Sequence, residues 1–361
     1  MRMKPQYIGR NRRLLGHPIS AGFKPGVNEG LYPNYNPDQT VETLAMRYTV
    51  ANAYSGSVLN SSGDIHFIPY SAAVGQKVSR NGSVNTYALV HTGSARYLGG
   101  VLSSTDEIHF AQFNAGVGQK ISAAGAVSTY SLVYTAANGY IGGVLNPANG
   151  DMHFIPYSAT RGQKISAVGT VSTYSLVYTT SPAYAGGVLN PYTGDIHMVP
   201  ASAVVGQKIS SAGTVSTYSL AHTCTIGYCY FGGVLDFGGN IHFVPKHATV
   251  GQKISKAGVV STYSLAYTTS DAYAGGVLAP NGDVHFIPLS AVVGQKVSPS
   301  GVASTYSLAY TTSGAYTGGA LSPDGCIYFV PFSGNVGQKI VLSNVVAFNA
   351  AKCQSAYLNH M

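Results

Sequence analysis

The tripeptide Gly-Gln-Lys returns seven times along the chain at almost constant spacing. Successive glycines of this tripeptide are 43, 44, 44, 45, 43 and 43 residues apart, and they are Gly75, Gly118, Gly162, Gly206, Gly251, Gly294 and Gly337. A repeat of this length is typical of folds in which each unit buries its apolar face only against a neighbouring unit. The repeats extend from about residue 42 to about residue 346 of the 361 residues, so stacked similar units must form most of the structure.

Each unit contains four short segments with strand character. Tyr174, Leu176 and Tyr178 occupy alternate positions, which is the period of a half-buried strand. Shorter apolar segments follow at residues 188–189, 196–199 and 208–209, and turn residues such as Asn281-Gly282 separate the equivalent segments of another unit. Because no unit shows a helical period, the sequence predicts an all-β protein.

Four strands in a unit of about 43 residues, repeated seven times, predict a seven-bladed β-propeller. An isolated four-stranded sheet would expose two apolar faces and two unpaired edges, whereas a closed ring covers each face with the next blade. A β-solenoid is the competing interpretation, but it usually needs shorter coils and dedicated caps, and no cap is visible in the sequence.

Two segments could close such a ring. Residues 42–48 align with the Thr-Tyr-Ser-Leu segment of the repeats, and they would complete the last blade from the N-terminal side. Alternatively, residues 347–352 are a decayed eighth copy of that segment. We favour the first arrangement, which gives an extended basic arm over residues 1–41, a propeller over residues 42–346, and a C-terminal tail over residues 347–361 that packs on or closes the ring.

A pair of glycines recurs at the same place in six units. Glycine destabilises a strand, so its recurrence needs a structural reason. The first unit has Ser55-Gly56-Ser57 at this place, which is still small. Small residues in every unit indicate close approach of backbones near a crowded axis. The pairs are Gly99-Gly100, Gly142-Gly143, Gly186-Gly187, Gly232-Gly233, Gly275-Gly276 and Gly318-Gly319.

Residues 275–288 read Gly-Gly-Val-Leu-Ala-Pro-Asn-Gly-Asp-Val-His-Phe-Ile-Pro. This run resembles a repeat, Gly-Gly-Val-Leu-x-Pro-x-Gly-x-Ile-x-x-Ile-Pro, of propeller-like proteins from microbes and their viruses. All seven units match; unit two departs at residues 103–106 and 111–112, and unit four has extra residues between Cys224 and Phe231. A basic arm ahead of near-identical repeats is similar to bacteriophage virion proteins of the head or tail. The resemblance implies the architecture and leaves the activity open, because propellers host many functions.

The non-repeating residues 1–41 are basic and rich in proline. Six bases stand against two acids, and apolar side chains are scattered among them without a period. One interpretation is a disordered tail. The other, which we favour because solvating tails are poor in aromatic residues, is an arm that orders on a partner surface. Three close charges make nucleic acid a weaker choice than an acidic protein. The resemblance to virion proteins implies that the partners are other virion proteins. The predicted partner-binding residues are Tyr7, Ile8, Arg10, Arg12, Arg13, Leu14, Leu15 and Phe23.

An Asp-x-His motif recurs at residues 64–66, 151–153, 195–197 and 283–285. Residues two apart lie on one face of a strand, so a carboxylate and an imidazole could meet in a metal site or a catalytic dyad. However, a catalytic site is usually built once from unlike residues. The repetition therefore favours a structural hydrogen bond, and we predict no catalytic and no metal-binding residues.

Two further sets of repeated residues could serve ligands. The seven lysines of the Gly-Gln-Lys tripeptides could attract an acidic partner if they share a face, although we favour a structural role at strand edges. The tyrosines before the glycine pairs could stack on sugars, although burial between blades is the better interpretation. The possible repeated ligand positions are Tyr97, Tyr140, Tyr184, Tyr273 and Tyr316.

The remaining features exclude several classes of protein. Cys224, Cys229, Cys326 and Cys353 lack zinc-like spacing, and isolated reduced thiols are expected, as in a reducing cytoplasm. No phosphate-binding loop, nucleophile elbow or other cofactor motif occurs. The sequence contains neither a secretory signal nor an apolar run long enough to span a membrane.

These observations predict a non-enzymatic binding protein without cofactors. We expect a virion component, assembled in the host cytoplasm, whose arm is anchored to a capsid or tail and whose propeller faces outward for decoration or attachment to a host receptor or glycan. The alternative is a free lectin-like propeller with repeated glycan sites.

Overall fold

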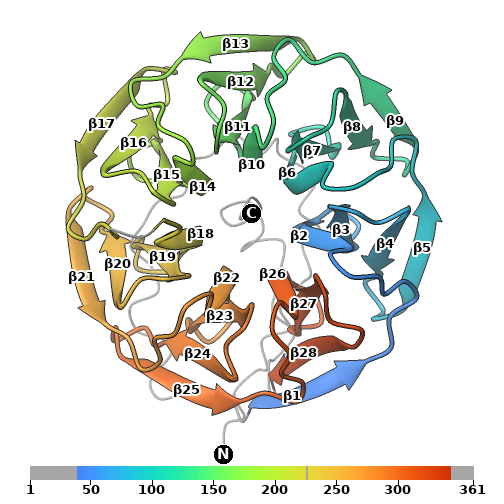
Figure 1. The fold of residues 1–361 in the computed structure, drawn as a ribbon, viewed down its shortest axis with the longest axis vertical. Helices are drawn as coiled ribbons and strands as arrows, with labels where there is room; N and C mark the ends of the chain where they lie inside the picture. The colour runs from blue at the N-terminus through green and yellow to red at the C-terminus, as the bar shows by residue number, and fades with distance from the viewer. Residues whose placement is uncertain (1–38, 225–226, 343–361) are drawn as a thin grey trace, which may run out of the picture. The chain divides into compact units, whose positions relative to one another are not determined.

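Seven four-stranded antiparallel sheets are arranged as blades around a central axis (Figure 1). The computed structural model describes residues 39–224 and 227–342, and all regular secondary structure in these ranges is β-strand. The prediction of a seven-bladed propeller is therefore confirmed. The strands of blade seven pack on those of blade one, so the stack closes on itself and is not a solenoid.

The blades are numbered in chain order, and their strands are given from the innermost to the outermost. Blade one contains β2 (Tyr54–Leu59), β3 (Ile65–Pro69), β4 (Val74–Val78) and β5 (Val84–Ala88). Blade two contains β6 (Tyr97–Leu102), β7 (Ile108–Gln112), β8 (Gly118–Ile121) and β9 (Val127–Tyr130). Blade three contains β10 (Tyr140–Leu145), β11 (Met152–Pro156), β12 (Arg161–Ile165) and β13 (Val171–Ser175).

The other four blades follow the same order. Blade four contains β14 (Tyr184–Leu189), β15 (Ile196–Pro200), β16 (Val205–Ile209) and β17 (Val215–Ser219). Blade five contains β18 (Tyr230–Leu235), β19 (Ile241–Pro245), β20 (Val250–Ile254) and β21 (Val260–Ser264). Blade six contains β22 (Tyr273–Leu278), β23 (Val284–Pro288), β24 (Val293–Val297) and β25 (Ala303–Ser307). Blade seven contains β26 (Tyr316–Leu321), β27 (Ile327–Pro331), β28 (Gly337–Leu342) and β1 (Gln39–Leu44).

Blade seven is assembled from both ends of the described chain. β1 pairs antiparallel with β28, from Gln39 opposite Leu342 to Leu44 opposite Gly337 (Figure 1). The favoured closure by an N-terminal strand is thus confirmed, and this strand begins at Gln39, three residues before the boundary predicted at residue 42. The alternative closing segment, residues 347–352, and the predicted partner-binding residues of the arm lie outside the described residues.

Each residue of the Gly-Gln-Lys tripeptide has a separate structural role. The glycine leaves room for an aromatic ring of the outermost strand, because a Cβ on Gly162 would clash with the ring of Tyr174. The glutamine is fully buried and joins two blades: Gln163 Oε1 accepts hydrogen bonds from the backbone N–H groups of Val133 and Tyr134, at the exit of blade two. The lysine Nζ lies 2.6 Å from the Asp151 carboxylate of its own blade.

The glutamine contact is repeated at all seven junctions between blades. In each case the Oε1 atom accepts from two successive N–H groups that follow the outermost strand of the preceding blade. Gln76 completes the ring, because its donors, Arg47 and Tyr48, follow β1 of blade seven. The other clamping glutamines are Gln119, Gln207, Gln252, Gln295 and Gln338.

The recurrent glycine pairs lie in the innermost strands, as the predicted approach to a crowded axis requires. Gly186 has a φ of +88°, at a bulge between Tyr184 and Gly187, and a Cβ added to it would lie 3.2 Å from the Gly232 Cα of the next blade. A Cβ on Gly187 would lie 2.7 Å from Ile155 of the preceding blade. The first glycine of a pair therefore supplies a left-handed backbone, and the second lets neighbouring blades pack closely.

The antiparallel order gives the ring two different faces. On the face that we call the crossover face, each outermost strand ends and the chain passes to the next innermost strand. The opposite, hairpin face carries the turns between the first two and the last two strands of each blade. Gln39 and Leu342, which are paired, both lie at the hairpin face.

Candidate functional site on the crossover face

A ring of seven residues, which we call the collar, surrounds the axis on the crossover face. Each follows the second strand of its blade, and its carbonyl oxygen accepts a hydrogen bond from a backbone N–H just before the next innermost strand. For example, Tyr157 accepts from Ala183 at 2.6 Å, and Phe332 accepts from Ala53 at 2.9 Å across the junction of blades seven and one. The collar consists of Tyr70, Phe113, Tyr157, Ala201, Lys246, Leu289 and Phe332.

The collar side chains form a continuous arc of aromatic rings. Ring centroids are 5.6 Å apart for Tyr70 and Phe332, 5.8 Å for Tyr70 and Phe113, and 5.9 Å for Phe113 and Tyr157. These distances are typical of favourable aromatic pairs. The same side chains pack on the starts of the innermost strands, including Leu98. The other apolar clusters contain residues of adjacent blades, whereas this one extends around the axis.

Tyr228 fills the gap that Ala201 leaves in the arc. It precedes blade five, has a φ of +70°, and donates its backbone N–H to Ser202 Oγ next to Ala201. Its ring stacks on Tyr157 with centroids 6.2 Å apart and planes 18° apart. On its other side the Lys246 Nζ lies 4.7 Å from the ring centroid, so the arc ends in a cation–π contact.

Titratable side chains adjoin this end of the arc. His247 Nε2 lies 3.0 Å from Asp271 Oδ1, and His247 Nδ1 lies 3.4 Å from Ser270 Oγ. The Lys246 Nζ lies 3.3 Å from the same Asp271 oxygen. Burial alone would raise the pKa of Asp271, but the hydrogen bond from His247 and the charge of Lys246 hold it below its ordinary value. The carboxylate is therefore ionised near neutral pH and can accept a hydrogen bond from His247 Nε2.

The position of His247 carries a small polar residue in every other blade, namely Ser71, Asn114, Ser158, Ser202, Ser290 and Ser333. Ser158 and Ser181 share a hydrogen bond across the junction of blades three and four, and Ser290 and Ser313 do so between blades six and seven. At this one junction His247 contacts Ser270, the counterpart of Ser181 and Ser313, and also the charged Asp271. Residues 246, 247 and 271 differ from the corresponding residues of the other repeats. A search for residues that all repeats share therefore does not find them.

The repeated tyrosines considered as ligand positions are buried. Tyr97, Tyr140, Tyr184, Tyr273 and Tyr316 are all 0% exposed. Each hydroxyl donates to a backbone carbonyl of its own blade, as Tyr184 does to Val205 at 3.1 Å. Burial raises the pKa of the Tyr184 hydroxyl. These rings pack inside the blades and present no face to a ligand.

The Asp-x-His motifs are structural, but their partners differ from the expected ones. His153 Nδ1 lies 3.2 Å from the Tyr174 hydroxyl, while Asp151 bonds to Lys164. Burial lowers the pKa of His66, His109, His153 and His197 to about 4, and that of His285 to about 3, so these rings are neutral near pH 7. The lysines do not form a free cationic face, because Lys77, Lys120, Lys164, Lys208, Lys296 and Lys339 pair with carboxylates.

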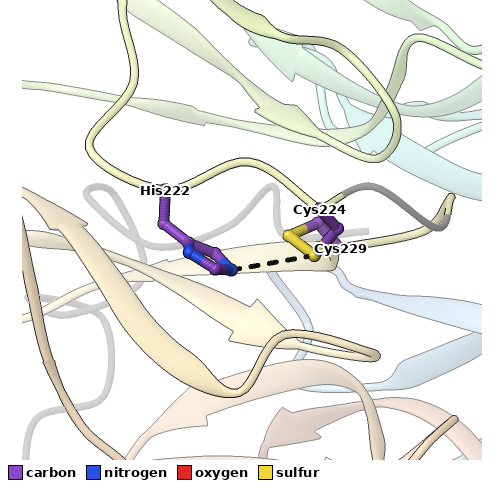
Figure 2. A group of neighbouring side chains, drawn as sticks. All are labelled: His222, Cys224 and Cys229. Atoms are coloured by element: carbon purple, nitrogen blue, oxygen red, sulfur yellow. Dashed lines mark hydrogen bonds between the residues drawn. A yellow bond between two sulfur atoms is a disulfide. The ribbon is translucent and has the colours of Figure 1, made fainter.

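The expectation of isolated reduced thiols is wrong for two cysteines. Cys224 and Cys229 form a disulfide on either side of Tyr228, and His222 Nε2 lies 3.8 Å from Cys224 Sγ (Figure 2). The spacing between cysteines alone does not reveal this histidine two residues away. In residues 39–224 and 227–342, these side chains form the one group of three that could hold a metal ion. Cys326 is free and buried.

No protein-family model matches the chain, and no curated protein matches it significantly. Within the described ranges, no helix is long and apolar enough to cross a membrane.

Solved structures share the fold. A streptogramin B lyase superposes with a TM-score of 0.73 at 20% identity over 84% of this chain and 98% of the lyase. Virginiamycin B lyase from Staphylococcus aureus gives 0.72 at 16% identity over 84% and 100%. An auxiliary nutrient binding protein from Bacteroides ovatus gives 0.56 at 12% identity over 85% and 78%.

These comparisons correct the expectation that the chain is not an enzyme. Equivalent blades were expected not to build a catalytic site, yet propellers of the same architecture are lyases. The premise that the blades are equivalent also fails in this chain, because Tyr228, Lys246, His247 and Asp271 differ in kind from their counterparts in the other blades. The chain therefore has a seven-bladed propeller fold that it shares with lyases and with nutrient-binding proteins.

Proposed function

We propose that the collar on the crossover face binds an amphipathic ligand with an aromatic or extended apolar surface. The observation that carries this proposal is the arc from Phe332 to Tyr228, which ends beside Lys246 and Asp271. Aromatic rings give a large contact area, and a few convergent polar groups fix the orientation of a ligand. Tyr228 is 36% exposed and Tyr70 is partly exposed, so both can contact a molecule at the axis.

The aromatic fluorophore 8-anilinonaphthalene-1-sulfonate tests this site. We expect saturable binding to the wild type, and about tenfold weaker binding after Tyr228→Ala or Tyr70→Ala, which is a loss of about 1.4 kcal/mol. Lys256→Ala is the matched control, because Lys256 is exposed in a turn on the hairpin face. Equal affinities of all four proteins would contradict a binding site at the collar.

A second candidate function is lyase chemistry at the same site. The specific observation is the His247–Asp271 pair, in which the aspartate orients the imidazole and leaves Nδ1 as its basic nitrogen. A histidine held in this way can take a proton from a substrate as a general base. A solved virginiamycin B lyase with Quinupristin, in which alanine replaces one histidine, is catalytically inactive, and this makes a histidine essential in that protein.

Quinupristin is accordingly the first substrate to test. Mass spectrometry should detect conversion by the wild type and at least a hundredfold slower conversion by His247→Asn, since general acid–base catalysis contributes about a hundredfold or more. If the wild type does not convert Quinupristin, Quinupristin is not a substrate. If His247→Asn converts it at the rate of the wild type, His247 is not the general base.

We propose further that residues 1–38 anchor the ring to a virion. The support is the resemblance of the repeats to phage virion proteins and the direct continuity of these residues with β1, which is a full strand of blade seven. Six bases and two acids in this segment favour an acidic protein surface. A chain that lacks residues 1–36 should fold normally and should no longer co-purify with particles. If the truncated chain still co-purifies with particles, residues 1–36 are not the anchor.

The lectin alternative is not supported by the buried tyrosines. Glycan binding at seven equivalent sites would need exposed rings in each blade, and the five tyrosines considered for it are enclosed.

A further inference from the structure

The loop that carries Tyr228 is held at its base by three potential metal ligands. His222, Cys224 and Cys229 each offer one ligand atom, and the three atoms lie within 4.8 Å of one another (Figure 2). We propose that these residues bind a soft divalent cation such as Zn²⁺ when the Cys224–Cys229 disulfide is reduced, and that the cation then replaces the disulfide as the cross-link of the loop.

The geometry fits a four-coordinate cation. With Zn–S distances of about 2.3 Å and Zn–N distances of about 2.0–2.1 Å, tetrahedral ligands lie about 3.6 Å apart for N and S and about 3.8 Å apart for two S atoms. His222 Nε2 is already 3.8 Å from Cys224 Sγ. Separation of the two sulfur atoms after reduction is therefore the main change that the site requires, and a water molecule completes the coordination.

Two of the three ligands stand on rigid parts of the ring. The backbone N–H of His222 donates to the clamping residue Gln252 at 2.7 Å, and its ring packs edge-on against Tyr230. The backbone N–H of Cys229 donates to Ala201 O at 2.7 Å, and its carbonyl accepts from Lys246 N at 3.0 Å. Such preorganisation lowers the cost of ordering ligands around a cation.

The chemistry balances with a dithiol as the reductant. The dithiol gives two electrons and two protons to the disulfide and becomes a disulfide itself, which leaves two thiols in the loop. Both thiols release their protons when they bind the cation as thiolates. His222 contributes the lone pair of Nε2 and keeps its proton on Nδ1. Two thiolates and a divalent cation have no net charge, which suits the buried and partly buried positions of the three ligands.

Cadmium binding tests the site directly. The full-length chain is reduced, freed of reductant without air, and titrated with Cd²⁺ while the thiolate-to-cadmium charge-transfer absorption is recorded. We expect one Cd²⁺ per chain, no band for Cys224→Ser or Cys229→Ser, and at least about tenfold weaker binding for His222→Ala. The double variant Cys326→Ser/Cys353→Ser keeps the three ligands and should bind as the wild type does.

Several results would overturn the site. A reduced wild type that gives no band excludes it, and a band that persists in Cys224→Ser assigns the metal to other cysteines. Unchanged affinity of His222→Ala excludes the histidine as a ligand; this variant keeps both cysteines, so it can be compared in the disulfide form to show that it folds.

A consequence for Tyr228 rests on the proposed function of the collar. Reduction without metal frees the loop, so fluorophore binding should weaken, and Cd²⁺ should restore it. If Cd²⁺ binds while fluorophore affinity stays constant, the metal site stands and its link to the collar fails. If the oxidised chain binds no fluorophore, the collar proposal fails independently of the metal titration.

Discussion

The clamping glutamines show how one side chain can join two blades. Gln295 is fully buried, and its Oε1 accepts from the N–H groups of Ala266 and Tyr267 at 2.8 and 2.7 Å. Its Nε2 has no protein partner, so the clamp acts through the oxygen alone. These two N–H groups lie after β21, the outermost strand of blade five, and the glutamine oxygen is their hydrogen-bond acceptor.

Replacement of this oxygen should therefore be costly. Gln295→Leu keeps the volume of the side chain and leaves the N–H groups of Ala266 and Tyr267 without this acceptor, so we expect a loss of about 2–4 kcal/mol of unfolding free energy. Urea titration followed by circular dichroism measures it. Lys256→Ala, on the exposed hairpin face, should change stability by less than about 0.5 kcal/mol. A loss below about 1 kcal/mol for Gln295→Leu would show that water reaches the clamp.

The buried histidines should make stability depend on pH. Burial lowers the pKa of His153 to about 4, whereas its ordinary value is 6.5, so the unfolded chain binds the proton more readily. The contribution is complete above about pH 6.5 and is lost as the pH falls toward about 4, where one such histidine can account for about 3 kcal/mol. Urea titrations between these pH values should show decreasing stability.

His153→Gln isolates one histidine of the set. The glutamine oxygen can still accept a hydrogen bond from Tyr174, but it does not titrate. The variant should therefore lose less stability on acidification than the wild type does. If the stability of the two proteins depends on pH to the same extent, the pKa of His153 is the same in the folded chain as in the unfolded chain.

At the scale of elements, β1 is the strand that closes the ring. It pairs along six positions with β28, and Leu44 packs with the core shared by blades seven and one. Without β1, the edge of β28 would be open to other chains.

Two truncations separate this strand from the segment before it. Removal of residues 1–38 should leave a monomeric ring with the thermal midpoint of the full chain. Removal of residues 1–44 should cost several kcal/mol, at about 1 kcal/mol for each ladder hydrogen bond lost, and should cause aggregation. Size-exclusion chromatography and thermal denaturation test both. A stable monomer without residues 1–44 would mean that another segment closes blade seven.

At the scale of the whole molecule, the positive charge is unevenly distributed. The full chain has 20 bases and 12 acids, which gives +8, and residues 1–36 hold six bases and one acid. Deletion of residues 1–36 therefore lowers the net charge by five, to +3. Six of the seven repeat lysines are paired with carboxylates, so the repeated tripeptides add little unpaired positive charge to the ring.

Cation-exchange chromatography should reflect this distribution. The chain without residues 1–36 should elute at clearly lower salt than the full chain near neutral pH. Elution at the same salt would show that unpaired lysines on the ring dominate binding to the resin.

The fold could be predicted from the sequence because the same pattern of strands and turns occurs in seven successive repeats. The period indicates the number of blades, and residues 42–48 reveal the closing strand by their likeness to the repeats. The collar could not be predicted in this way, because its residues differ between blades and their meeting depends on the curvature of the ring. Tyr228 shows the difficulty most clearly: it replaces the ring missing at Ala201 from a position 27 residues later in the chain.

The pairing of β1 with β28 also sets an order of events during synthesis. β1 is made before the other strands of the ring, and it cannot dock until β28, which ends at Leu342, has been made. Until then the growing protein is an unclosed arc whose leading strand has no place to pair. Closure of the ring thus follows synthesis of all seven blades, and any delay before β28 is complete prolongs the time during which an unpaired edge is available to other molecules.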